Sequence, residues 1–150
     1  MKRFRFSLQS VATLRALKEL RARENLAASI RAVEQALLAH AKAHTQREDL
    51  EGMLRAGRST LIRAGEQVAF LGALAAANLA EAASRQALAE AGTQRDHRVT
   101  EYHEAARDLK SLAKLETRAR EKHRLARERE EQNALDERAG LASRAAATLT

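Results

Sequence analysis

The chain has 150 residues, a formal net charge of +7 and 31% charged residues, but only 3% aromatic residues, six glycines and neither proline nor cysteine. So few aromatic residues exclude the deep core of an ordinary globular domain, and the absence of cysteine excludes disulfides and thiolate metal sites. Good helix formers dominate and no proline interrupts them. We therefore expect one all-α domain over residues 1–150, a long antiparallel two-helix coiled coil, or helical hairpin.

The first helix is predicted over about residues 8–56. Leu26, Ile30, Val33 and Leu37 are separated by steps of 4, 3 and 4 residues, which places them on one face of a helix with coiled-coil spacing. Upstream, an apolar series continues at a constant spacing of 3, so the register drifts. The members of that series are Leu8, Val11, Leu14, Leu17 and Leu20.

A turn is predicted at about residues 56–65, where glycines cluster. Gly57 and Gly65 lie at the ends of this stretch, and Ser59 and Thr60 inside it can cap a helix.

The second helix is predicted over about residues 66–147. Its apolar stripe steps by 3, 4 and 3 residues through Val99, Tyr102, Ala106 and Leu109, and Leu112 and Leu115 lie beside it. From residue 116 onward apolar residues become sparse, and Glu/Arg pairs at i,i+4 such as Glu116–Arg120 are expected. A helix this polar packs weakly by itself, which favours binding to a partner.

The two ends of the predicted hairpin differ in chemistry. Residues 1–24 hold seven basic and two acidic groups, a net charge of +5. Residues 68–92, beside the predicted turn, carry only Glu81, Arg85 and Glu90 as charged groups and include Phe70 and Leu74. The second helix is the longer one, so it should extend past the basic N-terminus. This polarity predicts two distinct partner-binding regions.

No pattern in the sequence indicates catalysis. A phosphate-binding loop and a strand to carry it are both missing, so we expect no enzyme and no cofactor. His40 and His44 are spaced for a metal, but only Glu48 could add a ligand, and we expect no metal site. The serines, Ser84 among them, and His123 are expected to be solvated. The apolar stretch at residues 68–80 is too short to span a membrane.

The residues at both ends resemble those of the flagellar FliJ family. At the N-terminus the similarity lies in Phe4-Arg5-Phe6-Ser7-Leu8-Gln9-Ser10-Val11 leading into a Leu/Arg/Glu helix. At the C-terminus it lies in residues 116–139, with Arg-Glu-Lys-His-Arg at 120–124 and Glu-Gln-Asn-Ala-Leu-Asp-Glu-Arg-Ala at 131–139. The resemblance covers almost the whole chain, and the Phe-x-Leu-Gln start and the Leu-Asp-Glu near the end carry most of it.

The resemblance implies a non-enzymatic cytoplasmic component of the bacterial flagellar type III export apparatus, peripheral to the inner membrane and without a transmembrane segment. Its expected partners are the export ATPase (FliI-like), the export gate protein (FlhA-like) and export chaperones. Gate binding is assigned to Phe70 and Leu74. The residues assigned to ATPase binding are Phe4, Phe6, Leu8, Arg124, Glu131, Asp136 and Glu137.

Three alternatives remain open. One is the equivalent stalk protein of an injectisome secretion system, which the sequence alone does not distinguish. Another is a basic coiled coil that binds nucleic acid through its N-terminal net charge of +5, although arginines 118–129 alternate with Glu121 and Glu128 and the dense basic helix of a bZIP protein is missing. The third is a coiled coil that associates with itself.

Overall fold

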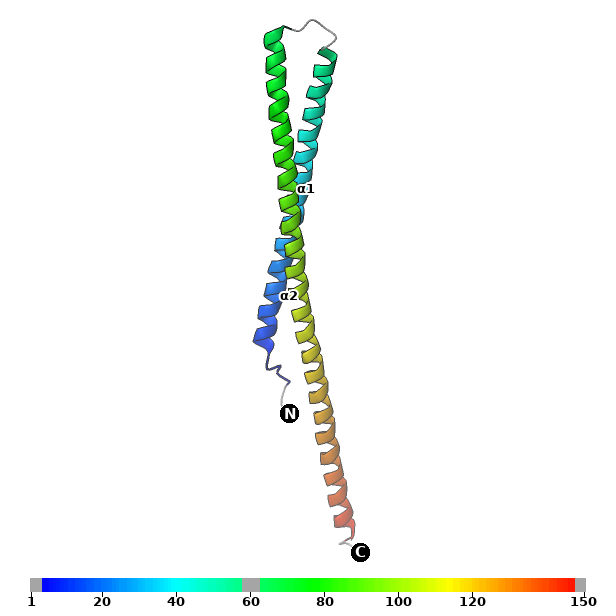
Figure 1. Cartoon of the computed structure of the whole chain (residues 1–150). Coiled ribbons are helices and arrows are strands. Elements are labelled where there is room, and N and C mark those ends of the chain that lie inside the picture. Colours follow the sequence, from blue (N-terminus) through cyan, green and yellow to red (C-terminus); the bar gives the residue numbers. More distant parts are fainter. Residues whose placement is uncertain (1–3, 58–62, 148–150) are drawn as a thin grey trace. The chain divides into compact units, whose positions relative to one another are not determined.

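Two long helices form the molecule. In the computed structural model, which describes residues 4–57 and 63–147, α1 spans Gln9–Gly57 (49 residues) and α2 spans Ala64–Ala147 (84 residues). They pack against each other as an antiparallel hairpin, and no strand occurs in the described residues (Figure 1). The predicted all-α helical hairpin is confirmed.

The start of α2 is held by its own first turn. The backbone N of Arg63 donates to Oε2 of Glu66 (3.4 Å), and the backbone N of Glu66 donates to the carbonyl oxygen of Arg63 (3.0 Å). This reciprocal pair satisfies two donors that a helix start leaves free, and a carboxylate there also suits the helix dipole. The sequence analysis placed the helices at about 8–56 and 66–147. Residues 58–62 of the expected turn, with Ser59 and Thr60, lie outside the described residues.

Contacts within the chain group its residues into two compact units. The terminal unit comprises Met1–Glu19 and Ala105–Thr150, and the central unit comprises Leu20–Glu104. Each unit contains a segment of both helices, so each has an interface of its own. The expectation of a single domain over residues 1–150 stays a prediction.

In the central unit the helices meet along half-buried residues that alternate in steps of 4 and 3, the core spacing of a coiled coil. We call these residues the seam. On α1 they are Ala22, Leu26, Ser29, Val33, Ala36, His40, Ala43, Arg47, Leu50 and Leu54. On α2 they are Phe70, Leu74, Ala77, Glu81, Ser84, Leu88, Ala91, Arg95, Arg98 and Tyr102. Many members are small or polar, so the helices are joined without a deep apolar core.

The apolar stripe predicted for the first helix was half right. Leu26 and Val33 lie in the seam, but Ile30 and Leu37 are 42% and 55% exposed. The reason is that Ser29 and Ala36, each one residue earlier, occupy the seam positions instead. Small side chains there allow the two backbones to approach, and this turns the larger neighbours toward the flank of the interface.

The terminal unit contains the only two buried hydrophobic residues of the described chain, Ala105 and Leu112, at 1% and 4% exposure. The C-terminal stripe predicted from the sequence is largely confirmed, since Leu109 is half-buried, although Leu115 is 47% exposed. The N-terminal part of α1 buries less apolar surface than expected. All five residues of its N-terminal apolar series are between 37% and 67% exposed.

Candidate functional site

The N-terminal segment lies against α2 through an aromatic contact. Phe4 is half-buried, and its ring meets the ring of His123 edge to face with centroids 5.4 Å apart. The Cζ atom of Arg120 lies 5.5 Å from the centre of the same ring, a cation–π contact. His123 was expected to be solvated, and the structure corrects this, because Phe4 covers it.

Beside this contact the surface has a small hollow with an apolar and a charged side. It is lined by Phe4, Arg5, Phe6, Gln9, Glu116 and Arg120. The predicted pair of Glu116 and Arg120 is present at 2.6 Å and forms the charged side. Such a hollow suits an apolar side chain of a protein partner that carries a charge next to it. Leu8, the third N-terminal residue assigned to ATPase binding, follows Phe6 by two residues in the sequence and is 38% exposed.

Beyond His123, nearly all described side chains of α2 are exposed to solvent. Among residues 124–142 only Glu131 is half-buried, and the rest are exposed. Arg124 pairs with Glu128 at 3.0 Å, Arg127 pairs with Glu131 at 2.9 Å, and Asp136 accepts a hydrogen bond from Gln132 at 3.2 Å. Three leucines of this stretch are also exposed, Leu125 at 48%, Leu135 at 59% and Leu141 at 66%.

This exposed stretch has the chemistry of a docking helix. Its i,i+4 pairs are each worth only about 0.2–0.5 kcal/mol, so they support the helix weakly. The charged groups and leucines together offer both polar and apolar contacts to a protein surface. Asp136 and Glu137 also line a shallow hollow with Gly140, Leu141 and Arg144.

Phe70 and Leu74, assigned to gate binding, belong to the central unit and lie half-buried in its seam. The apolar side chains that reach the surface around them are different ones. Val68 is 69% exposed, Leu71 is 49% exposed and Leu79 is 73% exposed. The sequence analysis assigned none of these three to gate binding, although the phase of the heptad pattern on α2 would have placed them off the seam.

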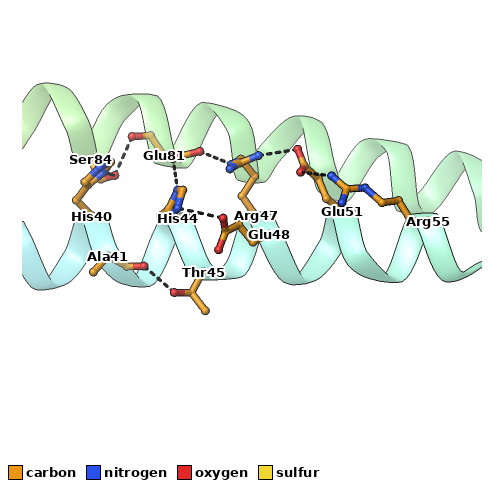
Figure 2. Close-up of polar contacts among 10 residues, drawn as sticks. All are labelled: His40, Ala41, His44, Thr45, Arg47, Glu48, Glu51, Arg55, Glu81 and Ser84. Carbon is orange, nitrogen blue, oxygen red and sulfur yellow. Dashed lines mark hydrogen bonds and ion pairs between the residues drawn. The ribbon is translucent and has the colours of Figure 1, made fainter.

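A group of polar side chains crosses the central seam, and we call it the polar cluster (Figure 2). Nδ1 of His44 lies 2.7 Å from Oε1 of Glu81, and Nε of Arg47 lies 2.5 Å from Oε2 of the same carboxylate. The hydroxyl of Ser84 donates to the carbonyl oxygen of Glu81 at 2.8 Å. Its oxygen therefore accepts from Nδ1 of His40 at 3.1 Å, because a hydroxyl has one hydrogen.

The polar cluster continues along α1. Nη1 of Arg47 donates to Glu51 at 2.6 Å, and Nε2 of His44 faces Glu48 at 3.2 Å. The hydrogen bond from His44 and the charge of Arg47 lower the pKa of Glu81 below its ordinary 4.5, although partial burial acts in the opposite direction. Burial alone would lower the pKa of Arg47, but the carboxylates of Glu51 and Glu81 outweigh it and raise that pKa.

The sequence placed His40 and His44 on one face but not their partners on the other helix. Ser84 was expected to be solvated, and it is half-buried in the seam instead. Ser84 follows Glu81 by three residues and so lies in the same heptad phase on α2. This spacing could have predicted that Ser84 and Glu81 both face α1. Within residues 4–57 and 63–147, no three His, Cys, Asp or Glu side chains are grouped so that they could hold a metal ion. Over the same ranges, neither helix offers a stretch long and apolar enough to cross a membrane.

The residues assigned to the two partners fall into different units. All seven assigned to the ATPase lie in the terminal unit, and both assigned to the gate lie in the central unit. Four of the seven line two different hollows, Phe4 and Phe6 the N-terminal one and Asp136 and Glu137 the C-terminal one.

Comparison with known proteins gives one match. A family model described as "Flagellar FliJ protein" matches residues 4–148. Searches of curated proteins and of solved structures found no match.

Proposed function

The chain belongs to the flagellar FliJ family, and from that membership we propose that it serves the flagellar export apparatus as a non-enzymatic subunit that binds the export ATPase ring. Its proposed role is that of a stalk-like rod, which promotes ATPase assembly or turnover. The observation that carries the proposal is the family match over residues 4–148, nearly the full chain.

The terminal unit supports the proposed ATPase contact. Residues 124–142 present charged and leucine side chains to solvent, with Glu131 alone half-buried. The hollow at Phe4 and Phe6 adds an apolar contact next to the Glu116–Arg120 pair. A partner that covers these surfaces would bury apolar area that the chain itself leaves exposed. We assign this contact to Phe4, Phe6, Leu8, Arg124, Glu131, Asp136 and Glu137.

The central unit supports a second contact, to the export gate. The apolar residues Val68, Leu71 and Leu79 are exposed around Phe70 and Leu74, on a part of α2 with few charges. An apolar patch of this kind favours a protein partner. We propose that the chain links the ATPase to the gate and to export chaperones, and that it works in the cytoplasm at the inner face of the inner membrane.

The first test measures ATP hydrolysis by the purified export ATPase of the same organism with and without this chain. A rise in rate that depends on the concentration of the chain is expected, while the chain alone should hydrolyse no ATP. A double variant, Arg124→Ala with Arg127→Ala, should weaken the effect. The matched control is Arg21→Ala with Arg31→Ala, which removes two exposed arginines of the central unit.

The proposal fails if the wild-type chain neither changes the rate nor comigrates with the ATPase on a sizing column. Equal effects of the two double variants would indicate that the ATPase contact lies outside residues 124–142. Retention of RNA or duplex DNA at physiological salt by a chain that is inert toward the ATPase would favour the nucleic-acid alternative.

A further inference from the structure

Much of the central seam does not specify how the two helices are aligned along their length. The pairing of His40 with Ser84, extended along the antiparallel helices, places three alanines of α1 opposite larger residues of α2: Ala22 opposite Tyr102, Ala36 opposite Leu88 and Ala43 opposite Glu81. An alanine leaves room for a larger side chain at the opposite position, and a shift of seven residues in either direction again brings a larger side chain opposite each of the three.

The polar cluster joins the two helices, whereas the other charged seam residues, Arg95 and Arg98, form ion pairs within α2. The side chains of Arg47 and Glu81 are only 20% and 22% exposed, so each has given up much of its hydration. Contacts with His44 and Arg47, both on the opposite helix, replace the lost hydration of the Glu81 carboxylate (Figure 2). A charge in such a place is costly when its partner is missing.

A shift by one heptad removes both partners of Glu81. In one direction, residues 51 and 54 would replace 44 and 47, which brings Glu51 and Leu54 toward the carboxylate. Like charges would then meet at a half-buried position. In the other direction, Leu37 and His40 would face it, and neither replaces the guanidinium of Arg47.

From this arrangement we propose that Glu81, with His44 and Arg47, sets the pairing register of α1 and α2 in the central unit. A polar residue at one core position is known to select register in coiled coils at some expense of stability. The register in turn decides which side chains of the two helices lie together on the flanks of the unit. The proposal concerns the fold, so it does not depend on the identity of the export partners.

Cysteine pairs can report the register, since the natural chain has no cysteine. His40 lies opposite Ser84, so Ser29, eleven residues earlier on α1, pairs with Arg95, eleven residues later on α2. The pair Ser29→Cys with Arg95→Cys therefore reports the native register. Ser29→Cys with Leu88→Cys, and Ser29→Cys with Tyr102→Cys, report shifts by one heptad in the two directions.

The experiment compares oxidative cross-linking within the monomer, at low protein concentration, for each cysteine pair in three backgrounds. In the natural background only the native pair should cross-link. In the Glu81→Leu background the shifted pairs should cross-link about tenfold more than in the natural one, because an apolar seam tolerates the shift. The Glu90→Leu background is the matched control, since Glu90 bonds only Gln86 of its own helix.

Cross-linking of the native pair alone in the Glu81→Leu background would overturn the proposal, and so would an equal rise of the shifted pairs with Glu90→Leu. Circular dichroism at 222 nm checks that each variant is helical. If Glu81→Leu loses helix, Glu81→Gln is tested in the same way, because it removes the charge and keeps the shape. Native cross-linking alone in that variant would likewise contradict the proposal.

Discussion

At the scale of single residues, Glu81 is held by two side chains of the opposite helix. It accepts contacts from His44 and Arg47 of the other helix, and it is one of two carboxylates whose pKa is lowered. The other, Glu101, has its pKa lowered first by the hydrogen bond from Arg98, three residues earlier on the same helix. Of these two carboxylates, Glu81 is the one that contacts the other helix, so protonation of Glu81 should weaken the hairpin directly.

The Glu81 contacts should make stability depend on pH. Because the folded-state pKa of Glu81 lies below 4.5, the unfolded chain binds the proton more readily, so this stabilisation is present above pH 4.5 and is lost as pH falls below it. Glu81→Gln should therefore lower the melting temperature at pH 7, and the difference from the natural chain should shrink toward pH 3. Thermal unfolding followed by circular dichroism measures this. Glu90→Gln is the control, and a constant difference at all pH values would exclude the linkage.

Phe4 should hold the N-terminal segment on α2. Phe4→Ala removes the contacts with His123 and Arg120, and since Phe4 is only half-buried the expected loss is about 1–2 kcal/mol. Hydrogen exchange should show faster opening of the first turns of α1, with little change in residues 64–100. Phe4→Leu should retain most of the apolar contact. Unchanged exchange in Phe4→Ala would mean that the ring does not anchor the segment.

At the scale of the helix pair, we expect stability to be concentrated where a large apolar side chain is buried between the helices. Leu112→Ala, at a position 4% exposed, should cost about 2–4 kcal/mol in the free energy of unfolding. Leu115→Ala is the matched control, because it makes the same change three residues later at 47% exposure, and it should cost about 0.5 kcal/mol. Urea unfolding measures both values. Similar costs would mean that Leu115 is also covered, as it would be in a self-associated form.

At the scale of the whole molecule, the chain exposes far more surface than a compact protein of its mass. Its accessible surface is 12195 Å², whereas a folded monomer of 16.6 kDa is expected to expose about 7,600 Å². Within residues 4–57 and 63–147, sixteen large hydrophobic residues are among those exposed. A chain with so little burial gains less from the hydrophobic effect, which is consistent with function in a complex.

Calorimetry should detect this low burial. Compact proteins of 150 residues unfold with a heat-capacity change of about 1.8–2.3 kcal/mol/K, mostly from newly exposed apolar surface. We expect a value clearly below that range for the isolated chain. Sedimentation across concentrations is the control for self-association. A value within the range, with a concentration-dependent mass, would indicate that the chain buries its exposed hydrophobic residues against other copies.

Much of the architecture could be predicted without coordinates. The absence of proline, the wealth of good helix formers and the 3–4 spacing are local properties of the chain, so they determined two long helices and their antiparallel pairing. The residues at both ends likewise indicated the family, which the match over residues 4–148 confirmed. The Glu116–Arg120 pair was also predictable, because i,i+4 neighbours lie together on any helix.

Only the tertiary structure decided which face of each helix is covered. Ile30 looked like a core residue, but Ser29 occupies the seam, since close approach of the backbones favours the smaller side chain. The contact of Glu81 with His44 and Arg47 joins residues 37 and 34 positions apart, and heptad phase alone does not tell which residues of the two helices meet. Local periodicity thus determined the helices, and their rotation and alignment against each other arose from the balance of packing and charge across the seam.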